Sequence, residues 1–293
     1  MPANAILPPT HKGVVQTAPF TIEVQDVATP TIEEESDVIV KVLVSALCGS
    51  DLHIYRGHQK PPYGAKLPGA QAADSTLFIA PEDIADKNLV LMADIIPTGL
   101  FAAKSAWNML NEEERVDSSC CVIGCGPVGL CAITAAKQRF KTVYAIDGVP
   151  ERLVLAKAHG AIPLNLNENP LETISKLIGG GTDAVLELVG SPDAVLLAIE
   201  LARIGGVVIS AGVHTHSIEM PAQHLYNKNL RFQFGRCPAR ALFKEALELL
   251  RTVSKQSDVF DGFVEAIVPL SQAPEYYKKF NDRLVGKTVF IQG

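Results

Sequence analysis

The sequence lacks a long uninterrupted hydrophobic run. Of its 293 residues, 47% are hydrophobic and 20% are charged, yet no apolar stretch reaches the roughly 20 residues that a membrane-spanning helix needs. The sequence also lacks a basic excess, because its formal net charge is −6 and no basic stripe is present. We therefore expect neither a membrane protein nor a nucleic-acid-binding protein. The start, MPANAILPPT, lacks the pattern of a secretion signal.

Cysteine pairs with metal-site or redox spacing are also lacking. The six cysteines are Cys48, Cys120, Cys121, Cys125, Cys131 and Cys237, and no two of them form a CxxC pair. This spacing argues against a disulfide framework and against a four-cysteine structural zinc site. It predicts a protein of a reducing compartment, and we expect a cytoplasmic location.

One stretch, Cys120 to Asp147, has the full context of a dinucleotide-binding fingerprint. An apolar run, Ser119–Ile123, is typical of a buried parallel strand and leads directly into Gly-Cys-Gly-Pro-Val-Gly. A helical segment with small residues follows, and then a second apolar strand, Thr142–Ile146, which ends in Asp147. Strand, glycine turn, helix, strand and acid at this spacing predict an NAD(H) site.

Each residue type in the fingerprint has a physical role. Gly124 permits the tight turn, Gly126 lets a pyrophosphate approach the backbone, and Gly129 lets the helix lie close to the sheet. The free N–H groups at the helix start favour phosphate. Asp147 would bind the ribose hydroxyls and repel a 2′-phosphate, which favours NAD(H) over NADP(H). The cofactor-binding positions expected here are Gly124, Gly126, Pro127, Val128, Gly129, Asp147 and Arg152.

Strand and helix patterns alternate from about residue 115 to about residue 235, which predicts an α/β fold with a doubly wound parallel sheet. The region up to about residue 75 reads as β, and Asp37–Ala46 is its strongest strand pattern. Pro81–Leu110 is largely helical in pattern, with an interruption at Pro97-Thr98-Gly99. We predict a dinucleotide-binding domain over 114–236 and a second domain formed by 1–113 and 237–293.

Four motifs occur in the order of a known family. They are VLVSALCGSDLHIYRGH, ADIIPTGLFAA, VIGCGPVG with YAID, and GGVVISAGV. With them the whole chain resembles the medium-chain dehydrogenase/reductase superfamily, in its zinc-type alcohol dehydrogenase branch. The PTG turn is most similar to glutathione-independent formaldehyde dehydrogenases. The resemblance implies a Rossmann domain, a truncated GroES-like β domain, and an active site between them.

The resemblance also assigns roles to single residues. Cys48 and Asp94 fall on the first and third catalytic zinc ligands, and Ser50 and His53 fall on the relay that carries the alcohol proton. Thr98 would lie against the nicotinamide ring. The positions implied for catalysis are Cys48, Ser50, Asp51, His53 and Asp94, and those implied for the rest of the cofactor are Thr98, Val189, Gly190, Ala211, Val213 and Lys287.

The chain departs from the family pattern at the second zinc ligand. The family has His-Glu after Leu-Pro-Gly, whereas here Leu67-Pro68-Gly69 runs into Ala70-Gln71. The segment with the four-cysteine lobe is missing as well. Catalytic zinc normally has three protein ligands, so Cys48 and Asp94 are expected to be vestigial ligand positions that hold no metal, although His53 or His58 could replace the lost ligand.

Other readings of these residues stay open. Cys48 could be a small buried hydrophobic residue. Asp94 could be a structural aspartate, or a carboxyl group with a raised pKa that acts as acid or base. His214 and His216 resemble a metal pair, but we interpret them as a polar loop. The run Glu112–Arg115 is interpreted as a solvated helix end.

The sequence therefore predicts an NAD(H)-binding, alcohol dehydrogenase-like oxidoreductase. It would act on a small or medium organic alcohol or carbonyl without catalytic zinc, as a homodimer or homotetramer. Two alternatives stay open, namely a redox-neutral enzyme of the same fold and a nucleotide-binding protein without turnover.

Overall fold

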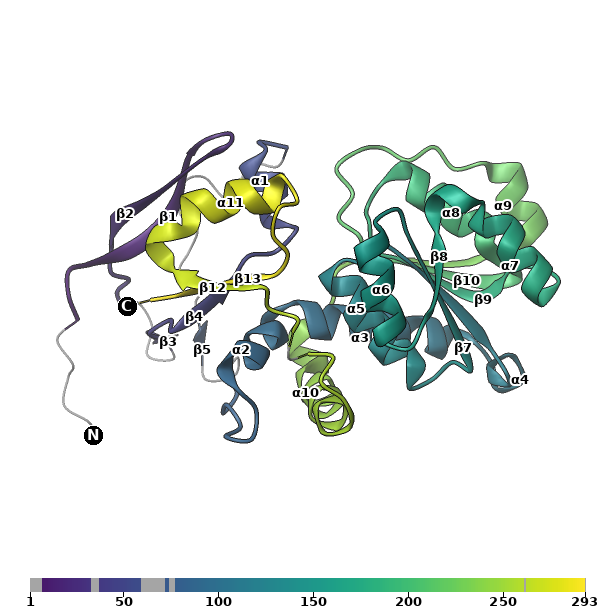
Figure 1. Cartoon of the computed structure of the whole chain (residues 1–293), viewed down its shortest axis with the longest axis horizontal. Coiled ribbons are helices and arrows are strands. Elements are labelled where there is room, and N and C mark those ends of the chain that lie inside the picture. The colour runs from purple at the N-terminus through teal and green to yellow at the C-terminus, as the bar shows by residue number, and fades with distance from the viewer. Residues whose placement is uncertain (1–6, 33–36, 59–71, 74–76, 261, 293) are drawn as a thin grey trace. The chain divides into compact units, whose positions relative to one another are not determined.

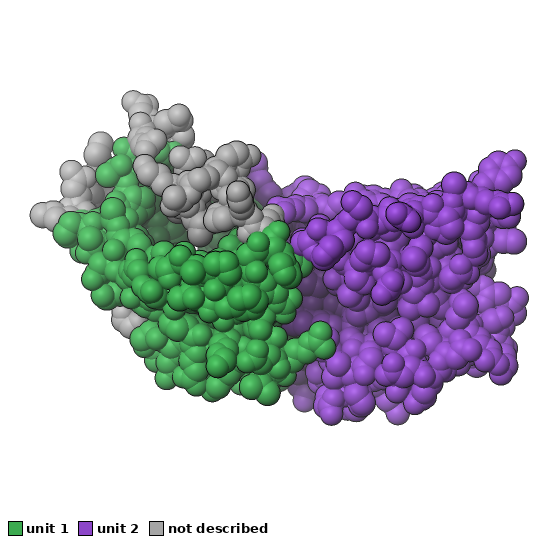
Figure 2. All heavy atoms as spheres, turned by 90° about the horizontal axis from the view of Figure 1, so that it is seen from above, with its two compact units in different colours: residues 1–90, 261–293 green, residues 91–260 purple. Residues whose placement is uncertain are grey.

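The computed structural model describes residues 7–32, 37–58, 72–73, 77–260 and 262–292. The chain forms two compact units, which Figure 2 distinguishes by colour. Unit 1 comprises Met1–Val90 and Asp261–Gly293, and unit 2 comprises Leu91–Phe260. The boundaries predicted from the sequence, at 113/114 and 236/237, follow the family resemblance and stay a prediction.

Unit 2 is built on a six-stranded parallel sheet with the order β11-β10-β9-β6-β7-β8 (Figure 1). Its strands are β6 (Ser119–Ile123), β7 (Thr142–Asp147), β8 (Ile162–Asn165), β9 (Thr182–Glu187), β10 (Ala202–Ser210) and β11 (Arg231–Phe234). Read from the first strand in the chain, this is the doubly wound order of dinucleotide-binding domains, with the switch point between β6 and β9. The predicted α/β fold and doubly wound sheet are confirmed.

Helices cover both faces of this sheet, and the side chains of its central strands are therefore buried on both sides. The helices of unit 2 are α3 (Ile95–Met109), α4 (Glu112–Arg115), α5 (Pro127–Lys137), α6 (Pro150–Ala158), α7 (Pro170–Ile178), α8 (Pro192–Leu201), α9 (Ala222–Lys228) and α10 (Ala239–Gln256), with a 3-10 turn at Leu166–Glu168. Ile174 of α7 and Ala198 of α8 join a core with Cys121 and Val185 on one face. Helices α3 and α5 pack against each other, and Val122 of β6 faces the start of α5.

Unit 1 is a smaller unit dominated by β structure. It contains the hairpin β1 (Thr10–Ala18) and β2 (Thr21–Ala28), the pair β3 (Asp37–Val38) and β5 (Ala72–Ala73), and a three-stranded sheet of β12 (Ala266–Pro269), β13 (Thr288–Ile291) and β4 (Val44–Ala46). Its helices are α1 (Asp51–Tyr55), α2 (Asp86–Leu89) and α11 (Ala273–Asn281), with 3-10 turns at Val90–Ala93, which runs on from α2 into unit 2, and at Leu270–Gln272. Leu47, Val268, Ala273 and Phe290 form its core.

Three local predictions are wrong. The strand predicted over Asp37–Ala46 is broken into β3 and β4, and Leu43 between them is 59% exposed. The backbone N–H and C=O groups of a strand need hydrogen-bond partners on a neighbouring strand. Residues 39–43 have no such partner strand in the part of the chain that the structure describes.

Pro97 does not interrupt a helix but lies in the first turn of α3, where the missing backbone N–H of proline breaks no helical hydrogen bond. Glu112–Arg115 is not merely a solvated end, because Glu114 is part of an ion-pair cluster.

Among the described residues, no single helix is long and apolar enough to cross a bilayer. Only the helix pair Asp86–Ala93 and Ile95–Met109, bent by 53°, reaches that length and composition together. Most residues of α3 in this pair are buried within the protein.

Candidate active site

The glycine turn lies at the carboxyl end of β6, where the sheet order switches. Gly124 has a φ of +93°, which favours glycine, and its N–H donates to the carbonyl of Ile146 at 2.9 Å. A side chain at Gly129 would overlap the carbonyl oxygen of Gly124, so this position must be glycine for α5 to lie close to the turn. Gly126 caps α5 with a φ of −70°, and a Cβ added there meets no atom within 4 Å. The turn therefore leaves open space at the helix start.

Asp147, at the carboxyl end of β7, is held against this turn. The carboxylate is 8% exposed, and it accepts hydrogen bonds from the Cys125 N–H at 2.8 Å and from the Val149 N–H at 2.9 Å. Arg152 Nη1 lies 3.6 Å from the Asp147 carboxylate. Burial raises the pKa of the Cys125 thiol to about 12, so this thiol is protonated at neutral pH. The structure brings the predicted glycine turn, Asp147 and Arg152 together, as the fingerprint requires.

Two further loops leave the carboxyl ends of β9 and β10, where Val189, Gly190, Ala211 and Val213 were predicted to line the cofactor. Gly190 has a φ of +79°, and a side chain there would overlap the backbone of Val213. Val189 Cγ2 lies 2.8 Å from the place a Cβ of Gly124 would take. The loop after β9, with Val189 and Gly190, therefore packs against the loop after β10, with Val213. The loop after β9 also packs against the glycine turn at Gly124.

Asp94 and Thr98 lie together at the start of α3. The Thr98 hydroxyl donates to Asp94 Oδ1 at 3.3 Å. Cys237, which sequence reasoning did not assign to the site, joins them. Burial raises the pKa of the Cys237 thiol to about 11, while hydrogen bonding with Thr98 lowers it and the charge of Asp94 raises it. Cys237 follows β11 by three residues, and nothing in its sequence surroundings points to Thr98.

The predicted proton relay lies in unit 1. Asp51 Oδ2 accepts the Cys48 N–H at 2.8 Å, so this carboxylate stabilises the turn that presents Cys48. Ser50 is exposed ahead of α1 and makes no capping hydrogen bond with its side chain. His53 is partly buried, and its Nδ1 has no hydrogen-bond partner in the described part of the chain. Burial, followed by the charges of Arg56 and His58, lowers the pKa of His53.

Lys287, predicted to reach the cofactor, is 4% exposed and lies within unit 1. Its Nζ donates to the carbonyl of Leu47 at 2.9 Å, directly before Cys48. In this arrangement the ammonium group supports the backbone of the Cys48 turn. The roles assigned to Lys287 and to the other site residues stay predictions.

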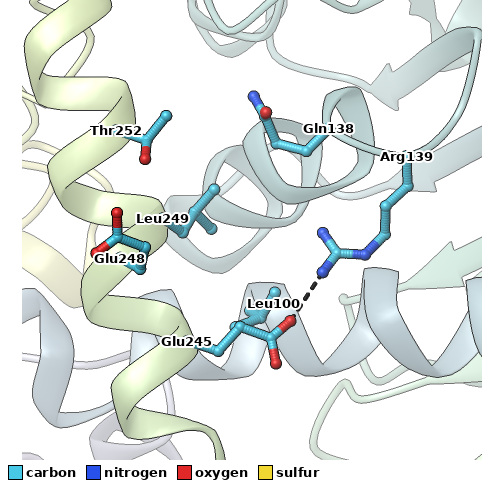
Figure 3. Close-up of a pocket in the computed structure, with 7 residues that line it drawn as sticks. All are labelled: Leu100, Gln138, Arg139, Glu245, Glu248, Leu249 and Thr252. Carbon is cyan, nitrogen blue, oxygen red and sulfur yellow. Dashed lines mark hydrogen bonds and ion pairs between the residues drawn. The ribbon is translucent and has the colours of Figure 1, made fainter.

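A hollow of about 210 Å³ in unit 2 lies away from these groups. It is formed at the C-terminal end of α5, which is opposite to the helix end that carries Gly126. Figure 3 shows Arg139 and Glu245 reaching toward one another across it, and their ion pair measures 2.9 Å. Lys104 also pairs with Glu245. Both ion pairs of Glu245 are therefore internal to unit 2, and we assign this hollow no part in the chemistry.

Of the three catalytic zinc ligands that the resemblance implies, this chain keeps two positions, Cys48 and Asp94. In the described part of the chain, no three His, Cys, Asp or Glu side chains group as a metal site. The segment after Leu67-Pro68-Gly69 lies outside the described residues, but its sequence offers Ala70 and Gln71 where the resemblance requires His and Glu. No histidine follows this motif before Asp94, so two ligand positions remain where zinc needs three.

Solved structures show the same fold. Alcohol dehydrogenase TADH from Thermus sp. ATN1 superposes with a TM-score of 0.83 at 24% identity, covering 97% of this chain and 100% of that chain. A short chain alcohol dehydrogenase from E. coli CFT073, solved in complex with the cofactor NADH, superposes with a TM-score of 0.78 at 19% identity. It covers 97% of this chain and 100% of its own. At these identities the likeness establishes the fold alone.

The sequence comparisons establish the family. Residues 127–252 match the family described as zinc-binding dehydrogenase. Zinc-type alcohol dehydrogenase B from Aspergillus flavus is 34% identical, with 98% of this chain and 85% of that protein covered. That alignment runs over 369 positions against 293 residues here, so at least 76 of its positions have no counterpart in this chain. The chain belongs to the zinc-type alcohol dehydrogenases of the medium-chain dehydrogenase/reductase superfamily.

Proposed function

We propose that this alcohol dehydrogenase-like oxidoreductase uses NAD(H) and acts on a small or medium organic alcohol or carbonyl without catalytic zinc. The observation that carries the proposal is the arrangement of Gly126 and Asp147. An open helix N-terminus and a buried carboxylate lie side by side at the switch point of a doubly wound sheet. This is the arrangement that receives the pyrophosphate and the ribose of a dinucleotide.

The residues of unit 2 fit this cofactor. The N-terminus of α5 would hold the pyrophosphate, because its first N–H groups are free of helical partners and Gly126 leaves room. Asp147 would receive the ribose hydroxyls, and the loops with Val189 and Val213 would flank the nicotinamide half. When bound, the cofactor supplies the hydride acceptor or donor.

NADH is expected to bind at least about tenfold more tightly than NADPH, because a 2′-phosphate beside the Asp147 carboxylate would be repelled. Isothermal titration calorimetry of both reduced cofactors measures this difference. Asp147→Asn should narrow it, and the thermal unfolding midpoint must be followed alongside, since Asp147 also accepts two backbone N–H groups. Equal affinities in the unmodified protein would contradict the role of Asp147.

The proton is handled by unit 1 in this proposal. Because the pKa of His53 is lowered, its ring is neutral at pH 7 and can accept a proton from an alcohol. The exposed Ser50 hydroxyl ahead of α1 can relay this proton. Asp51 supports this relay indirectly, because its carboxylate accepts the backbone N–H of Cys48 and so stabilises the turn ahead of α1. Without zinc, the developing alkoxide is stabilised by hydrogen bonds from the Ser50 hydroxyl and from the His53 ring once it has taken up the proton.

His53→Ala is expected to lower turnover by more than about tenfold while leaving NADH affinity nearly unchanged, because the residue acts on the substrate proton. In alcohol oxidation, kcat/KM of the unmodified protein should fall only below pH 6.5, the ordinary pKa of histidine. The pKa of His53 is lowered, so its neutral base form persists to a lower pH.

Cys48→Ala is the matched variant for His53→Ala and should change turnover little. Loss of turnover and of bound zinc together in Cys48→Ala would refute the zinc-free mechanism. Absence of turnover with every carbonyl and alcohol tried would favour the nucleotide-binding protein without turnover.

We also propose a homodimer, or a homotetramer built from it, that pairs through the edge strand β11. Among the described strands, β11 has a sheet neighbour on one side only, and Phe234 on it is 41% exposed. Tyr226 on the preceding helix is 85% exposed. Light scattering on the purified protein tests this, and a monomer at micromolar concentration would contradict it.

A further inference from the structure

A buried polar chain crosses the carboxyl ends of β9 and β10 and is not accounted for by the residues predicted from the sequence. Glu187, the last residue of β9, is fully buried. Its Oε2 accepts the Ser210 hydroxyl at 2.6 Å, and Ser210 Oγ lies 2.7 Å from His214 Nε2. His214 Nε2 is also 3.5 Å from the Glu187 carboxylate. The Ser210 hydroxyl therefore links the carboxylate to the imidazole by hydrogen bonds, and the imidazole also lies close to the carboxylate itself.

The chemistry of these groups fixes the direction of each hydrogen bond. An ionised carboxylate only accepts, so the single hydroxyl proton of Ser210 goes to Glu187. Ser210 can then only accept from His214, and Nε2 must carry the proton. In the neutral ring this leaves Nδ1 of His214 as an acceptor, and that buried atom has no hydrogen-bond partner among the residues that the structure describes.

This arrangement is unfavourable for the stability of the protein alone. A buried acceptor without a partner costs the desolvation of that group, and such exceptions call for an explanation. The ring otherwise packs beside Phe234, with ring centroids 5.8 Å apart, a contact that an aromatic hydrocarbon would make equally well. The hydrogen bond from Nε2 to Ser210 is therefore the contact that distinguishes an imidazole from a hydrocarbon ring at this position.

Glu187 holds both loops that are predicted to line the cofactor. With Oε2 occupied by Ser210, Glu187 Oε1 accepts the N–H groups of Val189 at 2.8 Å and Gly190 at 2.7 Å. The carbonyl of Glu187 accepts the N–H groups of Ala211 at 3.0 Å and Gly212 at 3.2 Å. Both loops are thus anchored on one residue, and His214 is the outermost member of the chain that orients its carboxylate.

We propose that His214 is a positioning residue that acts through Ser210 and Glu187 to set the two loops for the nicotinamide half of the dinucleotide. The inference rests on the proposed NAD(H) function. It concerns only the nicotinamide half, because the adenosine half is served by Asp147 at the carboxyl end of β7, on the other side of the switch point.

The test is His214→Phe, which keeps an aromatic ring beside Phe234 and removes the Nε2 proton. NADH affinity should fall about fivefold or more, as expected for one hydrogen bond in a connected chain. Affinity for ADP-ribose, which lacks nicotinamide, should stay within twofold of the unmodified protein. The thermal unfolding midpoint should be equal or higher, because the unpartnered Nδ1 is gone. Calorimetry with both ligands and a thermal scan give these three readouts.

His216→Phe is the matched control, since His216 is exposed in the same loop and its ring contacts only Thr215 among the described hydrogen bonds. It should change neither affinity. Ser210→Ala cuts the chain between His214 and Glu187 and should reproduce the selective loss of NADH affinity. Unchanged NADH affinity in His214→Phe, or equal losses for NADH and ADP-ribose with a lower unfolding midpoint, would overturn the inference. Failure of the unmodified protein to bind either ligand would instead refute the proposed function.

Discussion

Replacing Gly126 with Val is expected to weaken NADH binding by more than about a hundredfold without unfolding the protein, because a side chain would fill the space of the pyrophosphate. The backbone at Gly126 has a φ of −70° and a ψ of −176°, which any residue adopts, and a Cβ there meets no atom within 4 Å. The Cβ of the new side chain thus meets no protein atom. Calorimetry with NADH and a thermal scan of the variant measure the two effects.

Gly129→Ala is the contrasting variant three residues further on. Its Cβ would overlap the Gly124 carbonyl oxygen, a backbone atom that cannot move without opening the turn. We expect this variant to lose stability, whereas Gly126→Val should keep it. If Gly126→Val binds NADH as the unmodified protein does, the pyrophosphate does not lie at the start of α5.

Replacing Glu114 with Gln is expected to lower the free energy of unfolding of unit 2 by about 1–2 kcal/mol, which is between the values for exposed and for buried ion pairs because the two guanidinium groups are about a third exposed. Glu114 is 19% exposed, and both its oxygens accept from Arg231, at 2.6 Å and 3.0 Å. Arg203 adds a third contact at 3.0 Å. The variant would leave two guanidinium groups without this carboxylate. Urea unfolding followed by circular dichroism measures the change.

The same cluster predicts a pH dependence. The pKa of Glu114 is lowered from 4.5 to about 2, and hydrogen bonding from Arg231 is the largest cause. A carboxyl group whose pKa is depressed by folding stabilises the protein above its ordinary pKa, and this contribution is lost as the pH falls from 4.5 toward 2. Glu114→Gln should flatten that part of the profile. Glu113→Gln, at an exposed neighbouring position, should not, and an equal loss of stability in both variants would contradict the cluster's role.

The fingerprint was predictable because its chemistry is local. Gly124, Gly129 and Asp147 lie within one strand-turn-helix-strand unit, and each residue type answers a backbone requirement that a short stretch of sequence reveals. The helices of unit 2 were predictable for a similar reason, since proline at the first helical position and Asn or Ser caps mark several of their starts.

The rest depends on contacts between distant residues. Glu187 and Ser210 are 23 residues apart, and only the parallel register of β9 and β10 makes them neighbours. A glutamate in the apolar run AVLELV was the available signal, because a charge inside a buried strand must have partners. His214 was interpreted as part of a polar loop, and its link to Ser210 required the structure. The break between β3 and β4 has the same origin, since the Asp37–Ala46 pattern does not reveal whether neighbouring strands exist.

The measurement that tests the central claim most directly is NADH-dependent carbonyl reduction by the purified protein, with zinc quantified in the same sample before and after dialysis against a chelator. Activated carbonyls are the substrates of choice, because their reduction needs less stabilisation of the developing charge. The account predicts turnover with well under one zinc per chain and an unchanged rate after chelation. Turnover that disappears with stoichiometric zinc and returns when zinc is added back would contradict it.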